Sequence, residues 1–132
     1  NRSALEQTLA AADTPLQGLA NHVRNLGRAM EGDLPCRACM LMKTVLETSD
    51  DDTVLGRAAE EMLRQTEEVF AIAFRAARDR GQIDANSQPE RLALRLQSDI
   101  LGLRAYAQRS DAPARIGQLA DDIAQDIEAL AS

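Results

Sequence analysis

The chain of 132 residues is long enough for one domain with a sizeable hydrophobic core. Hydrophobic residues make up 45% of it but aromatic residues only 2%, and this balance favours helix over strand. The formal net charge of −6, without any long Lys/Arg run, excludes strong nucleic-acid binding by these residues themselves. No apolar run approaches the ~20 residues that a membrane-spanning helix requires, so we expect no membrane contact.

Helical periodicity and breaker residues predict an all-α fold with six helices and no strand. Asp13-Thr14-Pro15 ends the first helix and caps the second. Gly81 is a natural stop for the longest helix, and Ser87 and Glu90 have the spacing of a capping box for the next one. The expected helices span residues 3–12, 16–31, 36–47, 53–80, 87–109 and 113–131.

The short helix expected over 36–47 carries both cysteines. Cys36 and Cys39 are too close in sequence to join distant elements, which indicates a reducing compartment, the cytoplasm. The helix dipole, Arg37 and Lys43 together favour a thiolate at Cys36. This pattern suits a thiol sensor of electrophiles or oxidants. The alternative is that both cysteines are small hydrophobic residues of a core helix.

The last two predicted helices carry more apolar surface than one packing partner covers. The helix at 87–109 is apolar on two sides, and the helix at 113–131 has an aliphatic seam close to a coiled-coil pattern. We therefore expect a homodimer in which these helices form a four-helix bundle, with a single monomeric core as the alternative. The predicted interface residues are Leu94, Leu101, Gly102, Ala105, Ile116, Leu119, Ile123 and Ile127.

Catalytic and metal signals are weak in this sequence. No nucleophile and base occur in a recognisable spacing, and there is no Gly-rich phosphate loop. Two cysteines and one distant histidine fall short of the four ligands of a structural zinc site. We therefore expect no enzymatic activity, no metal and no cofactor.

Four short motifs follow one another along the chain. They are Cys39-Met40-Leu41-Met42 with Glu47, Ala77 with Arg80-Gly81-Gln82-Ile83, Gln88-Pro89-Glu90-Arg91-Leu92-Ala93, and Ile100-Leu101-Gly102-Leu103. In this order they resemble the G-C-L-L-x-N…E, A…G-E-L, D-P-x-x-L-A and L-x-G-L signatures in the regulatory half of TetR-family transcription repressors. Ala38 and Lys43 depart from the Gly and Asn that the family usually has.

The resemblance implies a domain organisation and a function. Such proteins are homodimers whose N-terminal helix-turn-helix domain reads operator DNA. Their C-terminal helical domain binds a small-molecule effector, dimerises through its last two major helices and releases the DNA. Residues 1–132 would be this effector-binding and dimerisation domain without the helix-turn-helix portion, so DNA binding is imputed to the absent segment. We therefore expect the chain to be a fragment of a longer protein.

Ligand pockets in helical domains are mostly apolar, with a few polar groups that orient the ligand. The predicted ligand-binding residues are His22, Leu26, Met42, Met62, Thr66, Phe70, Phe74 and Asp99. The alternative is that these are ordinary core residues, with the Thr66 hydroxyl bonded to the carbonyl four residues earlier. A helical protein-interaction module without a pocket is the rival hypothesis, and an all-α enzyme is a third.

Overall fold

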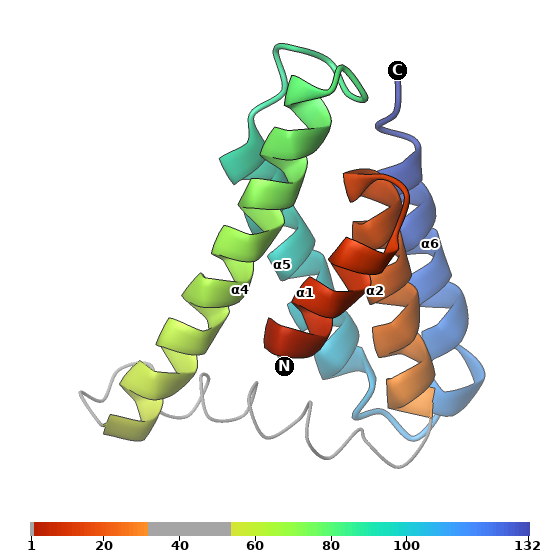
Figure 1. The fold of residues 1–132 in the computed structure, drawn as a ribbon. Coiled ribbons are helices and arrows are strands. Elements are labelled where there is room, and N and C mark those ends of the chain that lie inside the picture. The colour runs from red at the N-terminus through yellow and green to blue at the C-terminus, as the bar shows by residue number, and fades with distance from the viewer. Residues whose placement is uncertain (1, 32–53) are drawn as a thin grey trace.

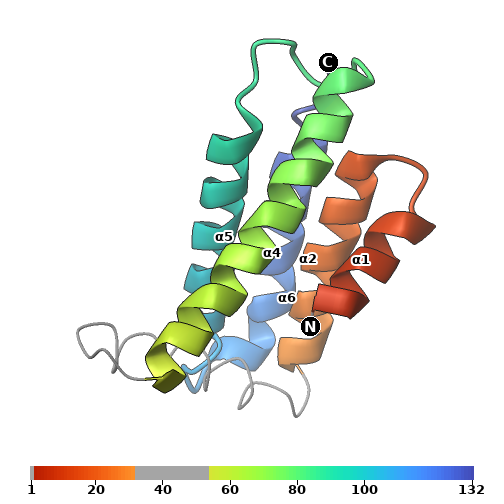
Figure 2. The same cartoon turned by 60° about the vertical axis from the view of Figure 1, so that its left-hand side comes forward.

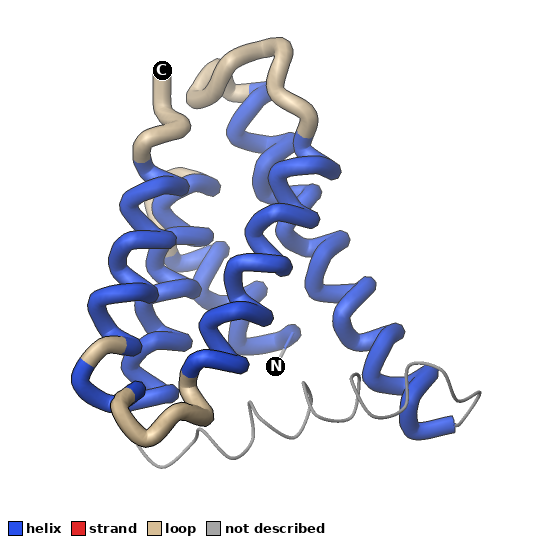
Figure 3. Tube along the Cα trace, turned by 180° about the vertical axis from the view of Figure 1, so that it is seen from behind, coloured by secondary structure: helices blue, strands red, loops and turns tan. Residues whose placement is uncertain are grey.

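The described residues form a bundle of α-helices without strands (Figures 1 and 3). The structure is a computed structural model that describes residues 2–31 and 54–132. Its elements are α1 (Arg2–Ala11), α2 (Pro15–Glu31), α4 (Val54–Asp79), α5 (Pro89–Tyr106), the 3₁₀ turn η1 (Ala112–Ala114) and α6 (Ile116–Glu128). The predicted all-α class is confirmed, while the predicted helix over 36–47 lies outside the described residues.

The ends of two helices follow from local sequence. Thr14 caps α2, because its hydroxyl oxygen accepts a hydrogen bond from the backbone N–H of Gln17 at 3.2 Å. Gly81 ends the turn after α4 with a φ of 76°, a left-handed conformation that glycine adopts without a steric penalty. Both features agree with the sequence-based expectation.

The start of α5 corrects the predicted capping box. Gln88 is the residue that precedes the helix, and no side chain caps it. The backbone N–H of Ser87 donates a 3.0 Å hydrogen bond to the carbonyl of Asp84, and the carboxylate of Glu90 forms an ion pair with Arg75 of α4. Pro89 at the first helical position still starts the helix, because its fixed φ suits that position and its missing N–H is no loss there.

The helices form two closely packed pairs. α6 lies along α2 and α5 lies along α4, with α1 packed against α2 (Figures 1 and 2). Figure 1 shows α4 leaning away from α2 toward the end where Val54 begins. At the opposite end the backbone N–H of Ser132 donates a 3.0 Å hydrogen bond to the carbonyl of Gln82, tying the tail to the α4–α5 turn. None of the described helices is both long and apolar enough to cross a bilayer.

Small residues bring α2 and α6 together. A methyl group at Gly27 would overlap the Cβ of Ala120, and one at Gly117 would overlap the carboxylate of Glu31. Both glycines therefore face contacts between α2 and α6 within the chain. The surrounding core is aliphatic, with Leu19, Val23 and Ile116 fully buried.

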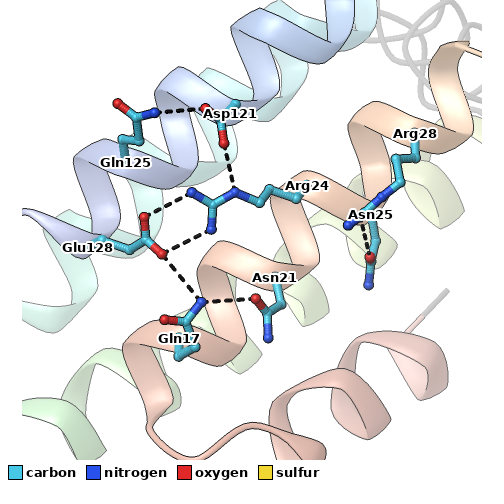
Figure 4. A network of polar contacts seen from close by, with 8 residues as sticks. All are labelled: Gln17, Asn21, Arg24, Asn25, Arg28, Asp121, Gln125 and Glu128. Atoms are coloured by element: carbon cyan, nitrogen blue, oxygen red, sulfur yellow. Dashed lines mark hydrogen bonds and ion pairs between the residues drawn. The ribbon is translucent and has the colours of Figure 1, made fainter.

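An ion network crosses the outer edge of the α2–α6 pair (Figure 4). The guanidinium of Arg24 donates two 2.9 Å hydrogen bonds to Glu128 and one of 2.8 Å to Asp121. The side chain of Gln17 reaches the same Glu128 carboxylate at 3.3 Å. Hydrogen bonding to Arg24 lowers the pKa of both acids. The network therefore favours the folded state while these carboxylates are ionised.

Replacing Arg24 with Met should lower the urea midpoint at pH 7, because two carboxylates lose their cation. The pKa of each acid is lowered by folding, so the stabilisation is present above the unfolded value of about 4 and is lost as the pH falls below it. The deficit of the variant should therefore shrink on acidification. Arg28→Met, on the exposed side of the same helix, is the control and should change little at either pH. A deficit of equal size at pH 7 and below pH 4 would contradict this account.

Candidate functional site

One histidine and one phenylalanine meet where α2 faces α4. The ring centroids of His22 and Phe70 are 5.8 Å apart and the planes are tilted by 54°. Phe70 is fully buried and His22 is half-buried. Burial lowers the pKa of His22 to about 4, and the positive charge of Arg104 contributes in the same direction. At neutral pH the imidazole is therefore uncharged, with one nitrogen free to donate and the other to accept a hydrogen bond.

Two polar side chains of α5 accompany this ring pair. Gln97 is buried and donates a 3.1 Å hydrogen bond from its amide to the carbonyl of Leu63 on α4. Arg104 is half-buried, and desolvation lowers the pKa of its guanidinium. We call His22, Gln97 and Arg104 the interior polar cluster. Of these three groups, His22 is the one in contact with the buried ring of Phe70, while Gln97 bonds to α4 two turns earlier, at Leu63.

The remaining predicted ligand residues on α2 and α4 differ in their surroundings. Leu26 is half-buried against the core. Thr66 is also half-buried, and its hydroxyl donates a 3.0 Å hydrogen bond to the carbonyl of Met62, as the alternative interpretation expected. The side chain of Met62 is 54% exposed. Met42, together with the possible redox residues Cys36, Cys39 and Lys43, lies outside the described residues.

Phe74 and Asp99 lie on the side of the molecule where α5 meets α6. Both line a hollow of about 280 Å³ between α5 and α6, with Leu92 and Ile123 among its other walls. Phe74 is buried at the bottom of this region, whereas Asp99 is exposed. The structure therefore places Phe74 and Asp99 at one hollow, with Phe74 one helical turn beyond Phe70 on α4.

The predicted interface residues divide into three groups. Gly102, Leu119 and Ile123 line a shallow hollow of about 250 Å³ on the outer face of α5 and α6. Leu94 is 57% exposed and faces a hollow beside α4, while Leu101 is half-buried and Ala105 is exposed. Ile116 and Ile127 are buried in the core of the single chain, so the fold covers them without a partner.

A further hollow of about 440 Å³ lies between α1 and α4. Leu9, Val69 and Ile72 provide its apolar walls, and Glu6, Asp13 and Arg80 contribute charged groups. None of these residues was among the predicted ligand residues. Across residues 2–31 and 54–132, no three His, Cys, Asp or Glu side chains gather as a metal site requires.

Sequence reasoning missed Gln97 and Arg104. A signal was present, because Ala93, Gln97, Ile100 and Arg104 follow the spacing of one helical face. A glutamine and an arginine on a face that also holds buried Ala93 and Ile100 indicate polar groups turned inward. The interpretation of this helix relied on its apolar residues, so the polar members of the face were not considered.

The comparison with protein families decides the identity of the domain. The family described as "Tetracyclin repressor-like, C-terminal domain" matches residues 15–123, which is most of the chain. The chain belongs to the TetR family. Comparisons of this TetR-family domain with curated proteins and with solved structures gave no match.

Membership confirms the resemblance seen in the four motifs and the all-α class. The matched residues run from the first turn of α2 into α6, so they include the interior polar cluster and most of the α5–α6 face. TetR-family regulators generally act as dimers that bind DNA and small-molecule effectors, and the family is not enzymatic. The chain is therefore a regulatory domain of a transcriptional regulator.

The neutral state of His22 predicts a pH dependence of folding. Folding lowers its pKa from 6.5 to about 4, so below pH 6.5 the unfolded chain takes up a proton that the folded chain excludes. The contribution of His22 to the free energy of unfolding is therefore fully present above pH 6.5 and declines toward pH 4. The total decline is roughly 3 kcal/mol, at about 1.36 kcal/mol per pH unit. His22→Gln should lack this component, because glutamine does not titrate.

The measurement is urea unfolding of both proteins between pH 7.5 and pH 4. Since His22 is the only histidine of the chain, the difference between the two curves isolates its titration from that of the carboxylates. A difference in unfolding free energy that stays constant across this range would show that His22 is not desolvated.

Proposed function

We propose that this TetR-family domain binds a small-molecule effector between α2, α4 and α5 and dimerises through α5 and α6. Binding of the effector then releases operator DNA from the helix-turn-helix domains of the dimer. The observation that carries the effector site is the neutral, half-buried His22 packed on buried Phe70. An aromatic wall beside hydrogen-bonding groups that are only partly accessible is the usual composition of a small-molecule site.

The helix arrangement supports a mechanism for the response. α2 is held to α6 by small-residue packing and by the Arg24 network. α4 is paired with α5 and diverges from α2 along its length (Figure 1). A ligand at the His22–Phe70 contact would favour one separation of α2 and α4. The effector shifts the dimer only by as much as its affinity differs between the two arrangements.

The support for dimerisation comes from Gly102. It lies inside α5, where glycine costs ~1 kcal/mol relative to alanine. A methyl group there would meet nothing within 4 Å, so packing inside the chain does not explain the glycine. Leu119 and Ile123 on α6 line the same shallow hollow and are only half-buried. A second copy placed on this face would cover them and make use of the close approach that Gly102 permits.

A ligand screen tests the effector site. Compounds that bind should raise the melting temperature, since a ligand at 100-fold excess over its Kd adds ~2.7 kcal/mol to the unfolding free energy. Phe70→Leu and His22→Gln should weaken the response to each hit, because one removes the aromatic wall and the other the imidazole. Ile72→Ala, at an exposed position of the same helix as Phe70, should leave it unchanged. Hits that are insensitive to both site variants would place the ligand elsewhere. A broad panel without any hit would instead favour an interaction module without a pocket.

A charge placed at Gly102 tests the dimer. Gly102→Arg should convert a dimer to a monomer in sedimentation equilibrium at micromolar concentration, because a buried guanidinium without a partner opposes association. Folding should be retained, since the position is open within the chain and arginine favours helix over glycine. Ile72→Arg, on an exposed part of α4, is the matched control and should remain dimeric. A wild-type chain that sediments as a monomer would overturn the dimer proposal.

A further inference from the structure

The hollow between α1 and α4 takes no part in the proposed effector site. Its volume is about 440 Å³, and its described walls come from residues 6–15 and 69–80, which are far apart in the sequence. Val69 and Ala73 are buried walls on α4, and Leu9 is a half-buried wall on α1. Ile72 lines the same hollow and is 53% exposed. A large apolar side chain is therefore left uncovered beside a space that can hold a ligand.

The packing of α1 explains why this hollow is open. α1 rests closely on α2, because a methyl group at Gly18 would come within 2.9 Å of the Leu9 side chain and 3.1 Å of its Cα atom. The contact between α1 and α4 is much less extensive. Several of the side chains that face the gap are small, and these are Ala10, Ala12, Ala73 and Ala76. The described side chains therefore do not fill the space between the two helices.

Opposite charges lie at one end of the hollow. α1 and α4 run in the same direction (Figures 1 and 2), and Asp13 and Arg80 follow shortly after the ends of these two helices. Both residues line the hollow and are exposed, so a ligand can reach them from solvent. They do not form an ion pair with each other. The carboxylate and the guanidinium are therefore each able to bind a separate charged group of one ligand.

We propose that this hollow is a second ligand site and that it takes an amino acid with an apolar side chain. The guanidinium of Arg80 presents two parallel N–H donors that match the carboxylate of the ligand. The carboxylate of Asp13 accepts hydrogen bonds from the ammonium group. The apolar side chain of the ligand lies along Leu9 and Val69 and covers the exposed surface of Ile72. A volume of about 440 Å³ is within the range of small-molecule sites.

The charges that line the hollow favour a zwitterion over an ion of one sign. A simple anion meets Arg80 but also the carboxylates of Glu6 and Asp13, and the formal net charge of −6 opposes its approach. A simple cation binds the acids but lies beside an arginine to which it offers no acceptor. A neutral apolar molecule uses neither charge. An ammonium group and a carboxylate on the same molecule satisfy both Asp13 and Arg80.

Calorimetry with matched analogues tests the proposal. Phenylalanine and leucine are compared with phenethylamine and isopentylamine, which lack the carboxylate, and with hydrocinnamate and isocaproate, which lack the ammonium group. The wild-type chain should bind each amino acid at least about fivefold more tightly than its analogues at low salt, because a charge pair near the surface gives a modest gain. Raising the salt concentration should reduce this preference, since exposed charges are screened.

Variants of Asp13 and Arg80 separate the two charges. Arg80→Gln should reduce the affinity for each amino acid to that of its amine analogue, and Asp13→Asn should reduce it to that of its acid analogue. Ala76→Leu should abolish binding of all these probes without lowering the melting temperature, because the larger side chain occupies the hollow. Arg91→Gln, at an exposed position of α5, is the control and should bind like the wild type.

Variants of the effector site distinguish the two proposals. His22→Gln and Phe70→Leu should leave amino-acid binding unchanged, because neither residue lines this hollow. Binding that is lost in those two variants and kept in Ala76→Leu would place the amino acid at the effector site and overturn the second site. Analogues that bind as tightly as the amino acids would contradict the assigned ligand class. If neither amino acid binds up to about 10 mM, the second site fails, and the effector site, which rests on other residues, is unaffected.

Discussion

The close approach of α2 and α6 is the constraint on which the rest of the described fold depends. Gly27 permits this approach, because a methyl group there would overlap the Cβ of Ala120, and Gly117 lies against the side chain of Glu31. The close approach of the two helices gives their buried side chains many van der Waals contacts and excludes water from the aliphatic core. The Arg24 network then fixes the register of the two helices at their outer edge. α2 is therefore held in a fixed position relative to α6, and α1 and α4 pack against it.

The fixed position of α2 determines the surroundings of His22. His22 is neutral because α2 holds it against Phe70 in a desolvated position. A neutral imidazole next to an aromatic ring is a polar group that can orient a ligand in a mostly apolar site.

Helices α5 and α6 contribute both to the core of the chain and to an outer surface. One side of α6 is used inside the chain, where Ile116 and Ile127 are buried. The adjoining side, with Leu119 and Ile123, is only half-covered and continues onto Gly102 of α5. Sequence periodicity places these residues on one aliphatic seam, because a helical wheel gives the direction of each side chain but not the helix that it contacts. Only the position of α2 divides the seam into a core side and an outer side.

The sequence by itself determined the helical class, most helix boundaries and the family, because breaker residues, caps and the four motifs are local signals. Thr14 and Gly81 acted as expected, and His22 and Phe70, both predicted ligand residues, are in contact with each other. The tertiary structure alone decided that Glu90 pairs with Arg75 rather than capping α5, and that Gly117 faces Glu31. Each of these depends on which side chain of a distant helix comes within bonding distance, and neither periodicity nor propensity carries that information.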